Sequence, residues 1–153
     1  MQKKIKAITL VLLILFIAIQ CYQPAGNVHK GKVAATDISR SYNIPADVKV
    51  ILQSSCYDCH SNHTNYVWYD YIQPARMVVE SHIKKGKKEL NFNEWGTYSD
   101  RKKERLLTAI KKQIETNEMP LPSYTLLHRN ARLGKKELQT VISWFNQQIN
   151  NND

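Results

Sequence analysis

The stretch Cys56-Tyr57-Asp58-Cys59-His60 decides how this sequence is interpreted. Two cysteines are separated by two residues, and a histidine follows the second one directly. On a helical turn, residues three and four positions apart lie on the same face. Both sulfurs and the imidazole of His60 can therefore point to one side of the turn. This is the attachment pattern of c-type haem, so it predicts one covalent haem with Cys56 and Cys59 as the thioether donors.

His60 is also predicted to bind the haem iron. Two thioethers would fix the porphyrin against the turn, which leaves His60 as the proximal axial ligand. Other uses of the motif are weaker. A structural zinc site needs four ligands, and only Cys56, Cys59 and His63 are at hand, with no further cysteine beyond Cys21. A thioredoxin-like pair needs a strand before it, which is missing here, and a plain disulfide would leave His60 unexplained.

The second axial ligand is predicted to be Met119. It lies in Glu118-Met119-Pro120-Leu121-Pro122, where two prolines end a helix and fix the loop. His63 lies only three residues beyond His60, and about 10 Å of chain is too short to reach the other face of the porphyrin. The remaining candidates are Met77, His82 and His128, and an open sixth position is a further alternative.

Apolar residues at helical spacing predict an all-α domain. Asn43-Ile44-Pro45 should open a helix that leads into the cysteine motif. Ser99 should cap a second long helix, and Gly134 should precede the last one. The expected apolar stripes are Val48, Ile51 and Leu52; Leu106, Leu107, Ile110 and Ile114; and Leu138, Val141, Ile142, Phe145 and Ile149, with Trp144 beside them. No alternation is long enough to build a sheet.

This order of helices, motif and Met-Pro loop resembles the mono-haem cytochrome c fold, in which the first and last helices pack together. Longer strings resemble the haem-binding domain family of short, anchored bacterial proteins over residues 44–147. The strings are Ser55 to Asn62, Val67-Trp68-Tyr69, Leu90 to Trp95 and Glu118 to Tyr124. Many members have Met-Pro-Pro-Pro where this chain has Leu121. The resemblance implies a covalent haem and a site outside the cytoplasm, and it implies no particular reaction.

The N-terminus has the layout of an export signal or membrane anchor. Lys3, Lys4 and Lys6 precede residues 7–19, which are apolar apart from Thr9. We predict a signal or anchor segment over residues 1–22, with residues 5–22 anchoring the protein to the inner membrane. A tether over 23–43 and a haem domain over 44–150 would follow on the periplasmic side. Signal cleavage and lipidation at Cys21 are the alternatives.

The chain is basic, with 22 Lys and Arg against 13 Asp and Glu in 153 residues and a formal net charge of +9. Its 42% of hydrophobic residues fits a globular domain and argues against a disordered or multi-span protein. The segment from Lys84 to Lys112 has ten basic and four acidic residues. It is interpreted either as a solvated helix face or as a docking surface for an acidic redox partner or anionic headgroups. No nucleic-acid motif accompanies it.

These features together predict an electron carrier and not an enzyme, with a haem-based sensor or gas-binding module as the alternative and a peroxidase-type enzyme as a weaker one. His82 or His128 would be the acid and base of such an enzyme. Aromatic residues are candidates either for packing on the haem or for the ordinary core: Trp68, Tyr69, Tyr71 and Trp95. Arg76 is interpreted as a propionate partner or as a surface arginine.

Overall fold

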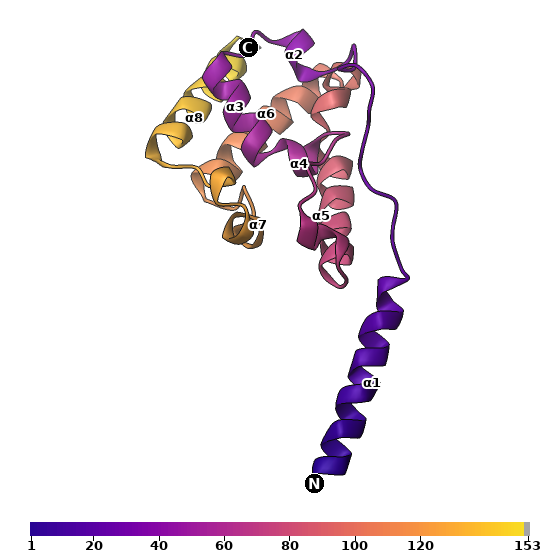
Figure 1. Cartoon of the computed structure of the whole chain (residues 1–153). Helices are drawn as coiled ribbons and strands as arrows, with labels where there is room; N and C mark the ends of the chain where they lie inside the picture. Colours follow the sequence, from indigo (N-terminus) through magenta and orange to yellow (C-terminus); the bar gives the residue numbers. More distant parts are fainter. Residues whose placement is uncertain (152–153) are drawn as a thin grey trace.

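The computed structural model describes residues 1–151, and within them every regular element is a helix. Figure 1 shows their arrangement. The α-helices are α1 Gln2–Gln20, α2 Ile38–Ser41, α3 Ala46–Ser55, α4 Tyr57–His60, α5 Ala75–Glu89, α6 Asp100–Glu115, α7 Pro122–Leu127 and α8 Lys135–Asn150. Three 3₁₀ helices are η1 Trp68–Tyr71, η2 Phe92–Thr97 and η3 Arg129–Ala131. The all-α prediction is confirmed.

Helix boundaries follow the local signals in the sequence. The side chain of Ser99 accepts a hydrogen bond from the backbone N–H of Lys102, so the predicted N-cap of α6 is confirmed. Pro45 directly precedes α3, and Gly134 directly precedes α8, as predicted. Proline and glycine suit these positions because the N–H groups of the first helical turn have no acceptor within the helix.

The core lies where α6 and α3 pack against α8, so the first and last helices of the domain are in contact. The predicted stripes supply most of it. Nine of these side chains are buried: Val48, Ile51, Leu52, Leu106, Leu107, Ile114, Val141, Trp144 and Phe145. Ile110, Leu138, Ile142 and Ile149 pack around them and are partly buried. Each buried aliphatic or aromatic side chain contributes roughly 1.5–3 kcal/mol, so this contact stabilises the domain.

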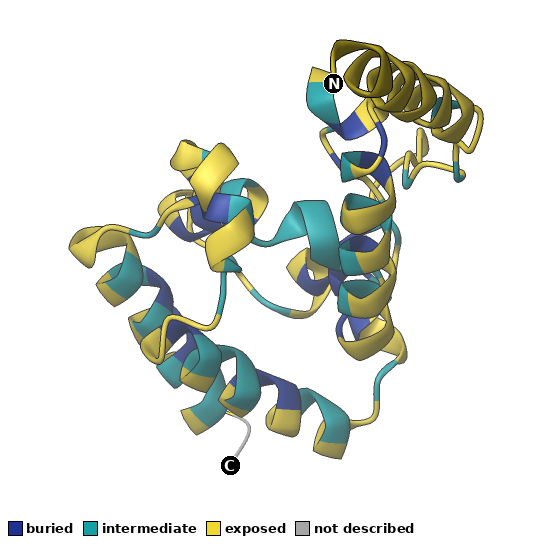
Figure 2. Cartoon of the chain, turned by 90° about the horizontal axis from the view of Figure 1, so that it is seen from below, coloured by how far each residue is buried: buried dark blue, intermediate teal, exposed yellow. Residues whose placement is uncertain are grey.

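A second group of helices lies beside that core. α4 packs on α5, η1 packs on α5, and η2 packs on α2. Figure 2 shows that the buried positions face inward between the helices and that the exposed ones face outward. Phe92 and Trp95 of η2 are buried, and they connect the two groups within one core.

The predicted tether is partly built into the domain. Residues 23–43 contain α2, and Asp37 and Ile38 are buried. Thr36 binds the segment to η2: its carbonyl accepts from the N–H of Gly96 at 2.7 Å, and its hydroxyl donates to the carbonyl of Asn93 at 2.6 Å. The folded domain therefore begins before residue 44.

The predicted anchor helix is not found. α1 projects away from the other helices and has no buried residue (Figure 1). Among residues 1–151, none of the helices combines the length and the apolar character needed to cross a membrane. The physical reason is that Lys3, Lys4 and Lys6 belong to this same helix. The apolar residues 7–19 rise only about 20 Å, against about 30 Å of hydrocarbon core.

Candidate functional site

The cysteine motif forms a single helical turn at the end of α3. Cys56 ends α3, and its carbonyl accepts from the N–H of Cys59 at 3.2 Å and of His60 at 3.0 Å. The two thiols and the imidazole line one cavity. The structure therefore shows the geometry expected from the three- and four-residue spacing.

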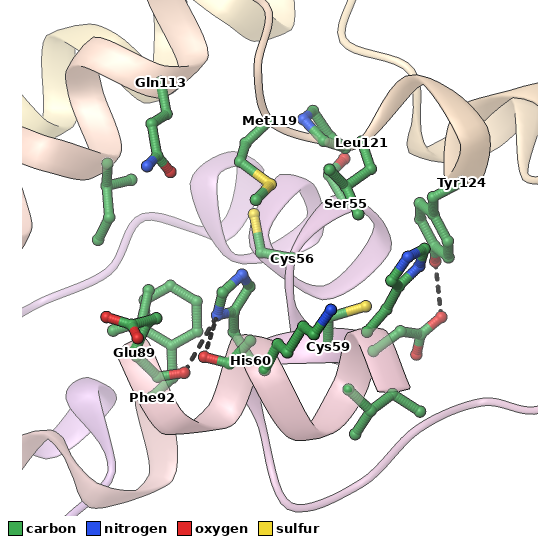
Figure 3. Close-up of a pocket in the computed structure, with 18 of the residues that line it drawn as sticks. Ser55, Cys56, Cys59, His60, Glu89, Phe92, Gln113, Met119, Leu121 and Tyr124 are labelled. Carbon is green, nitrogen blue, oxygen red and sulfur yellow. Dashed lines mark hydrogen bonds between the residues drawn. The ribbon is translucent and has the colours of Figure 1, made fainter. Parts of the chain in front are cut away.

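The ring of His60 is held in one orientation by α5. Its Nδ1 lies 3.1 Å from the carbonyl oxygen of Gly86 and 3.1 Å from that of Leu90, and carbonyls only accept, so Nδ1 carries the proton (Figure 3). The other nitrogen, Nε2, is left as an acceptor for a metal ion. Iron-binding histidines are commonly oriented by such a backbone hydrogen bond. Burial also lowers the pKa of His60, which favours the neutral ring that can bind a metal.

Gly86 allows α5 to approach α4 closely enough for its carbonyl to accept from His60. A Cβ atom at Gly86 would lie 2.7 Å from the carbonyl oxygen of Cys59 and 3.3 Å from Cε1 of His60. Only glycine allows two backbones to approach in this way. Nothing in the local sequence indicates what lies against Gly86.

Met119 reaches the cavity from the opposite wall. α6 ends at Glu115, and Asn117, two residues later, adopts the left-handed conformation with φ of 57°. The N–H groups of Glu118 and Met119 then donate to the carbonyl of Gln113 at 2.9 and 3.1 Å, which turns the chain back over the cavity. Figure 3 shows the Met119 sulfur directed toward Cys56, above the ring of His60.

The cavity has a volume of about 510 Å³, within the range of roughly 300–1,000 Å³ usual for small-molecule and cofactor sites. Most of its walls are apolar. They include Val79, Ile83, Leu90, Phe92, Leu106, Ala109, Ile110, Ile114, Leu121 and Leu133. Lys85 and Arg105 also line it, and both are otherwise exposed to solvent. An apolar cavity of this size suits a flat apolar ligand.

The two cysteines have the properties of buried thiols. Burial raises the pKa of Cys56 to about 12 and that of Cys59 to about 11, with a smaller contribution from neighbouring groups. Cys56 and Cys59 do not form a disulfide with each other in the structure. Thiols of this kind are poor nucleophiles, which argues against a thioredoxin-like pair. In the part of the chain that the structure describes, no three His, Cys, Asp or Glu side chains gather as a metal site, so the zinc alternative has no fourth ligand either.

The other candidates for the distal position separate into two groups. Met77 is exposed and lies outside the cavity, and His63 is exposed with its Nδ1 3.1 Å from the carbonyl of His29. His82 and His128 line the cavity together with Met119. Both ring nitrogens of His128 are engaged, Nδ1 with the carbonyl of Tyr124 at 3.2 Å and Nε2 with the hydroxyl of Tyr69 at 3.3 Å.

The aromatic candidates do not line the cavity. Trp95 is fully buried in the core beside Tyr42 and Tyr98, whereas Trp68 and Tyr71 are exposed and Tyr69 contacts His128. The core alternative is confirmed for Trp95, whereas Trp68 and Tyr71 belong neither to the core nor to the lining of the cavity. Trp95 was recognised as apolar, but nothing in the sequence distinguishes a core tryptophan from one that faces a ligand.

Both interpretations of Arg76 are also wrong. Its side chain is buried, forms an ion pair with Glu80 at 3.2 Å and donates to the carbonyl of Pro24 at 3.0 Å. It also lies over the ring of Tyr66. Arg76 therefore joins the N-terminal segment to α5 and does not contact the cavity.

Two site residues were missed in the sequence. Asp58, between the two cysteines, accepts a hydrogen bond of 2.7 Å from the hydroxyl of Tyr124 in α7. Both line the cavity. The two residues are 66 positions apart in the sequence, so no local pattern indicates the contact.

An all-α domain with a Cys-x-x-Cys-His turn and a methionine on facing walls of one apolar cavity has the features of a haem-binding protein. A comparison with protein families agrees, because the haem-binding domain family matches residues 14–147. The chain belongs to this family, and the predicted resemblance is confirmed. Neither the curated proteins nor the solved structures contain a match to it.

Proposed function

We propose that this protein attaches one haem covalently and serves as a one-electron carrier. In this proposal Cys56 and Cys59 provide the thioethers, His60 is the proximal ligand, and Met119 is the distal ligand. One observation carries it: the two thiols and the Nε2 of a pre-oriented His60 share an apolar cavity with the side chain of Met119. Family membership supports the binding of haem. The covalent attachment and the iron ligands are inferred from the geometry of the site.

Attachment would join the thiols of Cys56 and Cys59 to the two vinyl groups of the porphyrin. Each S–H would add across a C=C bond, so that a C–S bond would form and the hydrogen would go to the neighbouring carbon. No electron acceptor is consumed. Because Cys56 and Cys59 lie on one turn that is fixed by backbone hydrogen bonds, both additions need little rearrangement of the chain.

The protein's own contribution to electron transfer is to keep the site the same in both oxidation states. Bound haem would supply a one-electron iron couple, whose potential is raised by a methionine ligand. The carbonyls of Gly86 and Leu90 fix the ring of His60. The capped end of α6 fixes the backbone at Met119, and the apolar walls exclude water.

Optical spectra of the haem-loaded full chain test this proposal. After expression in a host equipped for c-type maturation, we expect haem that survives acid-acetone extraction, a low-spin spectrum, and a reduced form that is indifferent to carbon monoxide. Met119→Ala should open the sixth position and bind carbon monoxide, whereas the matched control Met77→Ala should behave like the wild type. Haem that is removed by acid-acetone would contradict the covalent attachment, and an unchanged Met119→Ala spectrum would exclude Met119 as the ligand.

A haem-based sensor or gas-binding module is the second candidate, with a peroxidase-type enzyme as a weaker form of it. It is favoured by His82, which shares the cavity with Met119 and could act near an exchangeable sixth ligand. Rapid binding of carbon monoxide to the reduced wild-type protein would favour this candidate. Peroxide turnover no faster than that of a free haem peptide would exclude the enzyme.

We further propose that an acidic redox partner docks on the basic segment from Lys84 to Lys112. Lys84, Lys85, Lys88, Arg101, Arg105 and Lys112 are exposed there, and two of them line the cavity. Electrostatic attraction at this position would bring a partner to the edge of the haem. Lys85→Glu should slow electron transfer to an acidic partner at low salt. The control Lys49→Glu, at an exposed lysine of α3 outside this segment, should not.

Export from the cytoplasm is proposed as well, because c-type attachment and the basic, apolar N-terminal segment both point to an extracytoplasmic compartment. In this view α1 directs the chain to the periplasmic side and contacts the membrane. Fractionation of cells that produce the full chain would contradict this if all of the haem-loaded protein were cytoplasmic.

A further inference from the structure

The hydrogen bond between Asp58 and Tyr124 joins the two halves of the cavity. Asp58 lies within the cysteine turn, while Tyr124 lies in α7, directly after the Met119 loop. The Tyr124 hydroxyl donates to Oδ2 of Asp58 at 2.7 Å, and the other carboxylate oxygen accepts from the backbone N–H of Asn65 at 2.9 Å. Asp58 is therefore fixed on its own side of the cavity before it accepts from α7.

Tyr124 is fixed on the other side. Its ring stacks on that of His128, with centroids 4.1 Å apart and an interplanar angle of 15°. His128 is in turn held by the hydroxyl of Tyr69 at 3.3 Å. The ring of Tyr124 thus has little freedom to turn its hydroxyl away from Asp58. A hydrogen bond from a phenol to a carboxylate in a partly buried place is among the stronger ones in proteins.

The position of Met119 depends on the two ends of its loop. At one end, the N–H groups of Glu118 and Met119 are bound by the carbonyl of Gln113. At the other end the loop enters α7 through Pro122, and Tyr124 follows two residues later. Pro120 and Pro122 restrict φ within this short loop, so a displacement of α7 is transmitted to Met119 and not absorbed between them.

We propose that Asp58 and Tyr124 form a clasp that positions Met119 as the sixth ligand and keeps the distal side of the haem closed. This inference rests on the proposed function, because it presupposes ligation by His60 and Met119. Neither residue is a catalytic residue; both are positioning residues. Without the clasp, α7 would lose its side-chain hydrogen bond to the cysteine turn, and the Met119 thioether would leave the iron more often.

Tyr124→Phe in the haem-loaded full chain tests the clasp, since it keeps the ring and its stacking and removes only the hydroxyl. We expect covalent haem in the same yield and an about tenfold faster reaction of the reduced form with carbon monoxide, the factor that the loss of one such hydrogen bond is worth. The reduction potential should fall, since methionine ligation raises it. Tyr98→Phe is the matched control: its hydroxyl accepts from the backbone N–H of Asn91 at 2.9 Å and lies outside the cavity, so carbon monoxide kinetics should stay unchanged.

Asp58→Asn provides a second, independent variant, because a neutral amide oxygen still accepts from Tyr124 but binds it less strongly. It should give an effect between those of the wild type and Tyr124→Phe, and it replaces Tyr124→Phe in the test if that variant fails to retain haem. Wild-type carbon monoxide kinetics and potential in both variants would overturn the clasp. Rapid carbon monoxide binding by the wild type would instead overturn the ligation by Met119 on which the clasp depends.

Discussion

Replacement of Gly86 by alanine should strain the contact that orients His60. A Cβ at this position would lie 2.7 Å from the carbonyl oxygen of Cys59, where ordinary contact begins at 3.4 Å. The opposing atom belongs to the backbone of the cysteine turn and cannot rotate away. α5 must therefore retreat by about 0.7 Å, which lengthens the hydrogen bond from Nδ1 of His60 to the carbonyl of Gly86.

The magnitude follows from two opposing terms. Alanine in the middle of a helix is better than glycine by about 0.5–1 kcal/mol. Forcing an extra methyl group into a packed contact costs about 1–3 kcal/mol. The second term is larger, so Gly86→Ala should lower the free energy of unfolding by about 1 kcal/mol, which is about 3–5 °C in Tm for a domain of this size.

Thermal unfolding and redox titration of the haem-loaded protein measure both consequences. The Tm should fall, and the reduction potential should shift because the His60 ring loses a fixed partner. Gly96→Ala is the matched control, since its Cβ would meet Thr36 at 3.1 Å, outside the cavity. It should lower Tm without changing the potential. A Gly86→Ala protein that is more stable than the wild type, as for an unstrained helical glycine, would refute the close approach of α5 to Cys59.

Three further changes test the rest of the fold. Phe145→Ala removes a fully buried ring from α8 and should cost about 3–5 kcal/mol in urea unfolding, whereas a loss below about 1 kcal/mol would contradict the packing of α8. Asn117→Val forces a β-branched residue to a φ of 57° and should cost about 1–3 kcal/mol, and Asn117→Gly should be tolerated; equal stabilities would be inconsistent with the turn that places Met119. Burial and Asp58 raise the pKa of Tyr124 above its ordinary value of 10.0. The unfolded chain therefore releases this proton first, and stability should fall as the pH rises above about 10, with a smaller slope in Tyr124→Phe.

Local signals in the sequence determined the secondary structure and the chemistry of the motif. Ser99, Pro45 and Gly134 mark helix starts because caps and prolines act within one turn. The apolar stripes predicted which faces are buried, since burial depends on the 3.6-residue period. Cys56, Cys59 and His60 could be grouped for the same reason, because neighbours three and four positions apart share a face of a helical turn. The all-α class followed from these patterns, and the family followed from the resemblance of longer strings of the sequence.

Short-range patterns failed where the outcome depends on partners far away in the chain. Arg76 is a buried ion-pair residue because Glu80 and the N-terminal segment enclose it. Trp95 is a core residue because Tyr42 and Tyr98 pack against its ring. The predicted anchor was wrong because α1 as a whole is not apolar enough. Three lysines and a short apolar run belong to the same helix. The burial of a side chain and the apolar character of a whole helix depend on the surrounding residues and not on one residue type.

The sequence by itself determined that this chain folds into helices, carries a Cys-x-x-Cys-His turn and belongs with haem-binding domains. The tertiary structure decided what surrounds that turn. Gly86 supplies the close approach that fixes the His60 ring, Asn117 turns the chain so that Met119 faces the cavity, and Tyr124 binds Asp58 across it. Each of these contacts joins residues from different helices. Their energies depend on distances of a few tenths of an ångström, which the linear order of residues does not contain.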